Sequence, residues 1–316
     1  MSKRSKDKLL RKMDKELNNS NYKRVIKLAD EIIKLDSTLS ETYISKFISL
    51  MKLKKETEAS NLFEGILDNL STTTYIGNIE ECLLNMKEYD KANGLYNKAY
   101  ELDPDFHDFF KSLLLEYIEF DISIDFLNHL DKNTPRWEDL YFLKAVLLSK
   151  FKKYEETIDV CDEILKDFPN HGNAYSKKTF CLSVLDRDEE LKEILEYRIK
   201  NNIRPNWALV DKGGYYLKKG NYDKAISLVD EVLEKKPGFG YALFSRANFM
   251  CIENKDLNEA LDYLNQALEG EVDPRYHNVA LGLKYNILDK LGREEEADKA
   301  LEEYTSATMA DLMDNI

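Results

Sequence analysis

The residues most able to do chemistry in this sequence are four histidines, four cysteines and several short acidic runs. The run DPDFHD at Asp103 begins like a calcium-binding loop, but Asp108 stands where that loop needs glycine and Leu114 where it needs glutamate. No histidine is paired with another histidine or a cysteine at the spacing of a metal site. These residues are His107, His129, His171, His277, Cys82, Cys161, Cys181 and Cys251. The sequence therefore predicts no metal site.

The acidic pairs and glycine-rich stretches also lack the pattern of an active site. Glu155–Glu156 and Glu294–Glu296 open predicted helices, where acidic side chains complement the helix dipole without any catalytic role. No phosphate-binding glycine loop is present, and GFGYAL at Gly238 lacks the third glycine and a preceding strand. We therefore expect no catalytic residues, no cofactor, no small-molecule substrate and no enzymatic activity.

Composition and charge favour a helical protein of the cytoplasm. The chain has 316 residues, 43% hydrophobic and 33% charged, with only 12 glycines and 6 prolines. Its net charge of −13 repels phosphate backbones, so nucleic acid is an unfavoured partner. No apolar leader follows the basic N-terminus, and no run is long enough to cross a membrane. The isolated cysteines favour a reduced, cytoplasmic protein.

One phrase recurs along the chain. It reads GNYDKAISLVDEVLEKKP at Gly220, KEYDKANGLYNKAYELDP at Lys87 and KYEETIDVCDEILKDFP at Lys153. Aligning these phrases on one small or apolar residue gives units of about 34 residues, a period that indicates stacked helical hairpins. The anchor residues are Val25, Ala59, Ala92, Thr157, Leu191, Ala225, Ala260 and Ala297, with a further unit hidden near Phe126. The sequence thus predicts nine repeats.

This pattern resembles the tetratricopeptide repeat (TPR) family. The residues that carry the resemblance are Gly213, Tyr216, Tyr222, Ala225 and Pro237 in one unit and Tyr89, Ala92, Tyr96, Ala99 and Pro104 in another. The resemblance implies an all-α solenoid of stacked helix-turn-helix repeats forming a right-handed superhelix. Small residues let two helices approach closely, and an aromatic side chain from the next helix fills the space beside them.

The predicted organisation has four parts. Residues 1–106 form repeats 1–3, and 107–137 form an irregular fourth repeat with Phe126 where a small residue belongs. We interpret that repeat as distorted and leave open a hinge there. Residues 138–304 form repeats 5–9. Residues 305–316 form a capping helix or a recognition tail, because Met309, Leu312, Met313 and Ile316 have helical spacing.

The resemblance also implies a binding groove on the first helix of each repeat. The residues expected to bind a peptide or protein partner there are Phe142, Val146, Phe180, Trp207, Val210, Phe249 and Ile252, with Lys177 and Arg246 as cations for an acidic peptide. A shift of one residue would instead place the aromatic residues in the core between repeats, and both interpretations stay open.

The preferred hypothesis is a noncatalytic scaffold for protein interactions. Two alternatives remain. The first is RNA binding through the basic N-terminal segment. The second is self-assembly into a homo-oligomer, with the basic N-terminal end of one copy meeting the acidic C-terminal end of another.

Overall fold

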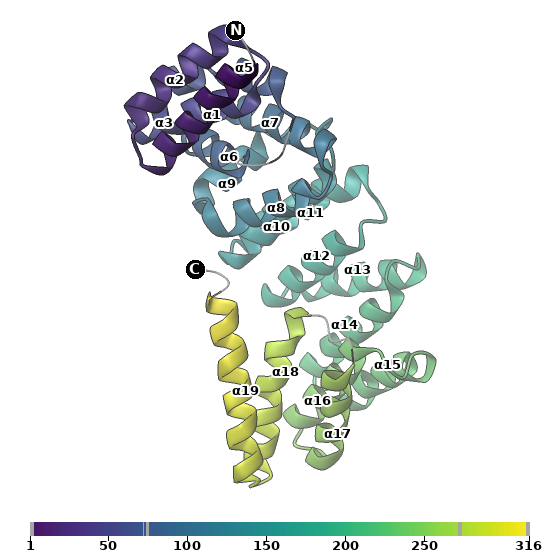
Figure 1. The fold of residues 1–316 in the computed structure, drawn as a ribbon. Helices are drawn as coiled ribbons and strands as arrows, with labels where there is room; N and C mark the ends of the chain where they lie inside the picture. Colours follow the sequence, from purple (N-terminus) through teal and green to yellow (C-terminus); the bar gives the residue numbers. More distant parts are fainter. Residues whose placement is uncertain (1–2, 72, 74–75, 271–273, 314–316) are drawn as a thin grey trace. The chain divides into compact units, whose positions relative to one another are not determined.

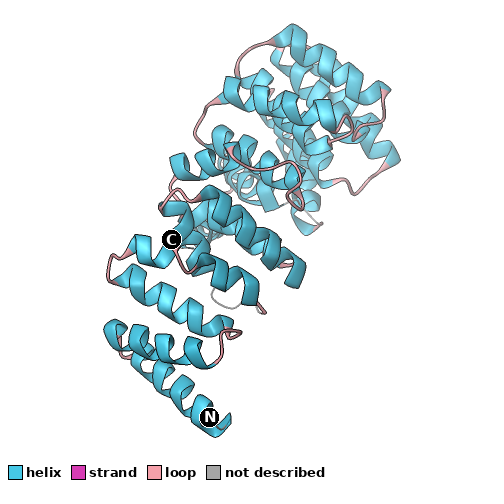
Figure 2. Cartoon of the chain, turned by 90° about the horizontal axis from the view of Figure 1, so that it is seen from above, coloured by secondary structure: helices cyan, strands magenta, loops and turns pink. Residues whose placement is uncertain are grey.

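The structure is a computed structural model that describes residues 3–71, 73, 76–270 and 274–313. Every regular element in these ranges is a helix, and Figure 2 shows no strand among them. The helices pack mainly on their neighbours in the sequence, as hairpins that stack one after another. These observations confirm the predicted fold class, an α-solenoid of repeated helical hairpins.

Contacts along the backbone divide the chain into two compact units, Met1–Leu147 and Leu148–Ile316 (Figure 1). The first unit contains α1 (Lys3–Asn18), α2 (Tyr22–Leu35), α3 (Ser40–Lys52), α4 (Glu56–Ser60), α5 (Phe63–Asn69), α6 (Ile76–Asn85), α7 (Tyr89–Leu102), α8 (Phe106–Ser112), the π-helical turn η1 (Leu113–Tyr117) and α9 (Phe120–Asn128). The unit boundary lies inside α10 (Trp137–Lys150).

The second unit is the more regular of the two. It contains α11 (Tyr154–Asp167), α12 (Gly172–Val184), α13 (Asp188–Lys200), α14 (Pro205–Lys218), α15 (Tyr222–Lys235), α16 (Gly240–Ile252), α17 (Leu257–Glu269), α18 (Pro274–Lys290) and α19 (Glu294–Met313). The helix α19 is continuous through residue 305. The side chains of Met309, Leu312 and Met313, and residue Ile316, on which the predicted cap depends, lie outside the described part of the structure.

The small residue of each repeat lies at the fourth position of the second helix of its hairpin. The eight predicted anchors hold this position in α2, α4, α7, α11, α13, α15, α17 and α19. Each is between 0% and 4% exposed: Val25, Ala59, Ala92, Thr157, Leu191, Ala225, Ala260 and Ala297. The spacing in the sequence therefore marks the point where the two helices of each hairpin pack together.

The anchor predicted for the fourth repeat, Phe126, is wrong by three residues. Because α9 begins at Phe120, its fourth residue is Ser123, a small side chain that is fully buried. The Ser123 hydroxyl donates a hydrogen bond to the backbone oxygen of Leu114, at 2.9 Å. The short helix α8 and the π-helical turn η1 shift the register here, and Phe126 packs edge to face with Phe110, with ring centroids 5.6 Å apart.

In every hairpin except that of the fourth repeat, the turn contains a residue with left-handed backbone geometry. It lies two residues before the second helix in seven hairpins, at Ser20, Lys54, Lys87, Lys152, Asp186, Gly220 and Gly292. Glycine adopts this conformation without the cost of about 1–2 kcal/mol that other residues carry. Because only Gly220 and Gly292 are glycines, packing of the two helices must stabilise the turn in the other five hairpins.

A close helix crossing in the second unit confirms the predicted role of its small residues. A Cβ atom added at Gly213 of α14 would lie 3.0 Å from the backbone oxygen of Ala225 and 3.2 Å from the ring of Phe249. Helices α14 and α15 therefore approach so closely that only glycine fits easily. Phe249, from the first helix of the next repeat, fills the space beside them and is 5% exposed.

A repeated ion pair joins the second helix of one repeat to the first helix of the next. In each case the acid lies five residues after the anchor, and the cation follows sixteen residues later. The pairs are Asp30 with Lys46, Asp162 with Lys178, Glu196 with Lys212, and Asp230 with Arg246, at 2.5–3.3 Å. The cations are largely buried and the acids half-exposed, so these pairs fix register more than they add free energy of folding.

In the third repeat an acid occupies the place of that cation. Glu80 of α6 lies sixteen residues after Glu64, is fully buried, and has no hydrogen-bond partner for either carboxylate oxygen among the described residues. Burial raises the pKa of Glu80 well above its ordinary value of 4.5. The folded chain therefore binds the Glu80 proton more tightly than the unfolded chain does, and the stability linked to Glu80 falls as pH rises above about 4.5.

Replacing Glu80 with glutamine should therefore stabilise the protein at pH 8 but have little effect at pH 4.5. Between the two pKa values the gain should grow by about 1.4 kcal/mol per pH unit. Urea unfolding of Glu80→Gln at several pH values measures this gain. The exposed neighbour gives a matched control, Glu81→Gln, which should show no such growth; an equal effect of both substitutions at every pH would contradict the buried, protonated carboxyl.

Candidate functional site

An open pocket of about 320 Å³ lies in the second unit. Its walls come mainly from α12, α14 and α16, the first helices of three successive repeats, and α14 contacts both of the others. The lining residues are Ser176, Thr179, Phe180, Ser183, Leu191, Arg204, Trp207, Val210, Asp211, Gly214, Tyr215, Tyr241, Phe244, Ser245, Asn248 and Phe249. Aromatic rings and hydrogen-bonding groups thus share one concave surface.

Two groups of aromatic side chains contribute to the pocket wall. Trp207 stacks on Tyr241, with ring centroids 4.6 Å apart and planes at 22°. Trp207 also packs edge to face against Phe239 at 5.4 Å, which fixes the orientation of its ring. On α12, Phe180 is 49% exposed while one edge of its ring meets Tyr154. The pocket lining therefore includes an indole held by two neighbouring rings and a phenyl ring that is half exposed.

A polar network under the pocket links the three repeats. Arg198 of α13 is fully buried and donates to the Asp211 carboxylate at 2.9 Å, to Thr179 Oγ1 at 3.1 Å and to Ser176 Oγ at 3.3 Å. The Tyr241 hydroxyl donates to the other Asp211 oxygen at 2.8 Å. Burial raises the pKa of Asp211, although Arg198 and Tyr241 oppose this shift. The network therefore holds α12, α14 and α16 at fixed separations.

Arg204 lies at the edge of the pocket, immediately before α14. Its backbone is left-handed, with φ of 45°, which is uncommon for a residue other than glycine. The side chain extends to the start of α12, because a Cβ atom added at Gly172 would lie 2.6 Å from Arg204 Nε. Strained backbone of this kind often accompanies functional sites. The missing side chain of Gly172 thus leaves space for a cation beside the pocket.

The predicted binding residues separate into three groups. Phe180, Trp207, Val210 and Phe249 line the pocket, but Val210 and Phe249 are only 1% and 5% exposed and so belong mainly to the core. Lys177, Arg246 and Ile252 lie on the pocket helices α12 and α16, outside the lining; Ile252 is 58% exposed and Arg246 pairs with Asp230. Phe142 and Val146 are half-buried on α10 in the first unit.

Sequence reasoning missed Arg198, Asp211 and Tyr241. One signal was available, because Arg198 follows Leu191 and Leu195 at the spacing of the buried face of α13. A charged side chain at such a position is almost never fully buried unless it has a charged or hydrogen-bonding partner. The partner could not be found from the sequence, since Asp211 and Tyr241 lie in the next two repeats.

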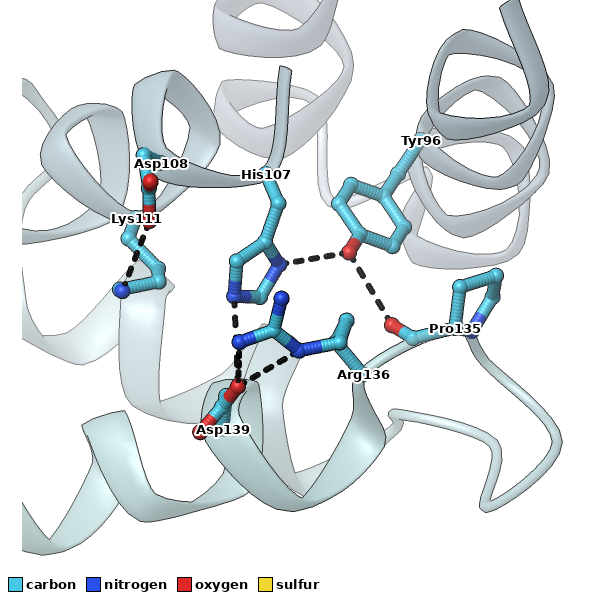
Figure 3. Close-up of polar contacts among 7 residues, drawn as sticks. All are labelled: Tyr96, His107, Asp108, Lys111, Pro135, Arg136 and Asp139. Atoms are coloured by element: carbon cyan, nitrogen blue, oxygen red, sulfur yellow. Dashed lines mark hydrogen bonds and ion pairs between the residues drawn. The ribbon is translucent and has the colours of Figure 1, made fainter. Parts of the chain in front are cut away.

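A second polar cluster lies in the first unit (Figure 3). The Tyr96 hydroxyl lies 2.8 Å from Nδ1 of His107 and donates to the backbone oxygen of Pro135 at 3.0 Å. Since that bond uses the phenol hydrogen, Nδ1 of His107 carries a hydrogen and donates to Tyr96. The other ring nitrogen, Nε2, lies 3.8 Å from Asp139, which Arg136 also contacts. The cluster ties α7, α8 and the start of α10 together.

Burial decides the role of this second cluster. Tyr96 and His107 are 0% and 2% exposed, so a substrate cannot reach them. Burial lowers the pKa of His107, and the positive charges of Lys111 and Arg136 lower it further. Burial also raises the pKa of Tyr96. Both side chains are therefore neutral near pH 7 and act as structural hydrogen-bonding groups.

Among the described residues, no three histidine, cysteine or acidic side chains converge where a metal ion could bind. None of the helices that the structure describes combines the length and the apolar character needed to span a bilayer.

Removal of the buried cation should destabilise the second unit. Arg198→Met leaves the Asp211 carboxylate without its charged partner and should lower the free energy of unfolding by about 3 kcal/mol. The double variant Arg198→Met with Asp211→Asn should lose less, because it keeps an acceptor for Tyr241 and no unpaired charge. Urea unfolding compares these with Arg187→Met, an exposed ion-pair control that should cost about 1 kcal/mol or less. If the double variant had a lower free energy of unfolding than Arg198→Met alone, the pairing of Arg198 with Asp211 would be contradicted.

Comparison with known proteins gives family matches for two segments. A family model described as "Psidin, N-terminal TPR repeats region" matches residues 7–125, and one described as "Tetratricopeptide repeat" matches residues 216–280. A comparison with curated protein sequences finds no match.

Three of the solved structures that are similar to this chain illustrate the likeness. A tetratricopeptide repeat protein from Parabacteroides merdae is 12% identical, with 90% of this chain and 99% of that chain covered and a TM-score of 0.43. Yeast Tom70 is 14% identical, with 95% and 77% covered and a TM-score of 0.46. A thermophilic TPR protein from Thermus thermophilus is 18% identical, with 54% and 99% covered and a TM-score of 0.45.

The family matches agree with the 34-residue spacing of the anchors and with the stacked hairpins. The chain is a tetratricopeptide repeat protein.

Proposed function

We propose that the second unit binds a segment of another protein in the pocket formed by α12, α14 and α16. Tetratricopeptide repeats are generally scaffolds for protein–protein interaction. The observation that carries the proposal is the pocket itself, in which Trp207 and Phe180 face a shared space on three successive first helices. Partly exposed aromatic residues beside polar groups are typical anchors of protein interfaces.

The dimensions of the pocket suit one or two side chains of an extended peptide. Its volume of about 320 Å³ lies at the lower end of the range for ligand-binding pockets. Ser183, Ser245 and Asn248 add hydrogen-bonding groups near the aromatic wall. A peptide could therefore place an apolar side chain against these rings while its backbone meets the polar groups.

The same geometry supports a role without catalysis. Asp211 is the acidic residue that lines the pocket, and both its oxygens already accept hydrogen bonds, from Arg198 and from Tyr241. A general base needs a lone pair directed at the substrate.

We further propose a cytoplasmic location, which is supported by the four free thiols at Cys82, Cys161, Cys181 and Cys251.

Filling the pocket at Gly214 tests the proposal without opening the core. Gly214 lies on α14, and the atom nearest to an added Cβ is the Phe249 ring at 4.0 Å. A phenylalanine side chain can therefore extend into the pocket, whereas alanine leaves it open. Alanine at Phe249 would be a poorer test, because Phe249 packs against Gly213.

The measurement uses peptides selected on the full-length chain from a displayed library of random twelve-residue sequences. Fluorescence polarisation should show that Gly214→Phe weakens their binding by at least about tenfold, while Gly214→Ala stays within about twofold of wild type. Circular dichroism checks that both variants keep their helices. Equal binding by Gly214→Phe would mean that the peptides bind elsewhere, and the proposed site would be wrong.

A further inference from the structure

We infer that helix α19 of one copy of this chain binds helix α1 of a second copy, in the way that a second helix packs on the next first helix inside the chain. Three features support this contact, and all of them are independent of the pocket. Each of the two helices has an uncovered face, their charges are opposite, and the ion pairs that join successive repeats fix a register between them.

One face of α19 lacks the cover that other second helices have. The residue four positions after the anchor is 0% exposed in α2, α11, α13, α15 and α17, each of which packs on the first helix of the next repeat. These residues are Ala29, Cys161, Leu195, Val229 and Leu264. The corresponding residue of α19 is Leu301, which is 37% exposed. Helix α19 packs on α18, and the described helices give it no second partner of that kind. The face that contains Leu301 is therefore open to a further first helix.

Helix α1 presents the matching face. In three of the repeated ion pairs the cation lies thirteen residues before the anchor of its own repeat, at Lys46, Lys178 and Lys212. Lys12 of α1 lies thirteen residues before Val25, but it is exposed and has no ion-pair partner among the described residues. Lys8 and Lys15 are exposed on the same face of the helix. Three lysines of α1 are thus available to acids from outside the first repeat.

The charges of the two helices select an end-to-end contact between unlike helices. Helix α1 contains seven basic and three acidic residues, whereas α19 contains seven acidic residues and one basic residue. Two α1 helices, or two α19 helices, would repel each other, while α1 and α19 attract. A second copy of the chain therefore supplies the complementary surface for each end.

The register of the contact follows from the ion pairs inside the chain. Glu302 lies five residues after the anchor Ala297, as the acid does in each of those pairs, and it has no ion-pair partner among the described residues. A pair between Glu302 and Lys12 of the second copy would continue the series. Because helices joined by short turns run antiparallel, Asp298, one turn before Glu302, would then lie beside Lys15, one turn after Lys12.

The same register covers Leu301. Leu195 and Ala208 belong to one buried cluster, and Ala208 lies seventeen residues before the anchor of its own repeat. Lys8 holds that place in α1, so its aliphatic stem would pack on Leu301 while its ammonium group stays in water. The contact is thus mainly electrostatic, with little apolar area. We expect it to be weak and sensitive to salt.

This contact joins two different surfaces. Each copy that binds through α19 keeps its own α1 free, so further copies can add at either end. Association should therefore increase continuously with protein concentration.

Sedimentation velocity of the full-length protein tests the contact. At low salt, the weight-average sedimentation coefficient of the wild type should rise between micromolar and about 0.5 mM protein. Raising the salt concentration to about 0.5 M should suppress most of this rise, because it screens the charges. A wild type that stays monomeric throughout this range at low salt would overturn the inference.

Charge reversal then identifies the surfaces. Lys12→Glu and Glu302→Lys should each shift association to at least about tenfold higher protein concentration, since each places like charges together. The double variant Lys12→Glu with Glu302→Lys should recover to within about threefold of the wild type. An equal mixture of the two single variants should also associate, because each supplies the end that the other lacks.

Lys200→Glu and Glu193→Lys provide matched controls, because they make the same charge changes at exposed residues of α13. Both should stay within about twofold of the wild type. Circular dichroism checks that every variant keeps its helices. If the double variant and the mixture associate no better than the single variants, or if no charge reversal weakens association, the pairing of α19 with α1 is wrong.

Discussion

The fold depends on the close approach of two helices at one buried, mostly small residue in each repeat. That residue lies at the fourth position of the second helix, where any larger group would push the first helix away. The crossing of α14 and α15 shows how little room exists there. A Cβ atom added at Gly213 would lie only 3.0 Å from the backbone oxygen of Ala225. In seven hairpins a left-handed residue two positions before the second helix brings the two helices to this separation, even where that residue is lysine or aspartate.

The same approach places the candidate site. Because each hairpin is tight, the first helices of successive repeats lie next to one another, and α12, α14 and α16 form one surface. The aromatic side chain that seals one crossing comes from the next repeat, as Phe249 does for Gly213. Part of the pocket wall therefore belongs to the core, as Phe249 does, and part is exposed, as Phe180 is. The network of Arg198, Asp211 and Tyr241 spans the same three repeats and resists changes in their spacing.

The spacing of small residues predicted the hairpins because a helix crossing constrains a single position strongly. Ser123 escaped notice because it follows the Ala92 anchor by 31 residues (123 − 92) instead of about 34, and no local sequence pattern indicates this shift. The pocket was predictable only to the level of the helices that form it. Val210 and Phe249 lie on the expected helices but are buried. A shift of one residue along a helix is enough to move a side chain from the exposed face to the packed face. Arg198 was visible as a charge on an apolar face, but its partners depend on how repeats stack.

A substitution at one crossing tests the central claim that packing at the buried anchor residue controls each hairpin and its nearest neighbours. Hydrogen exchange of Ala225→Leu should show faster exchange of backbone amides in α14, α15 and α16, while α2 and α3 in the first unit keep their protection. The volume-conserving neighbour Ile226→Leu serves as the control and should change little. Unchanged protection in α14–α16, or an equal loss throughout both units, would contradict the account.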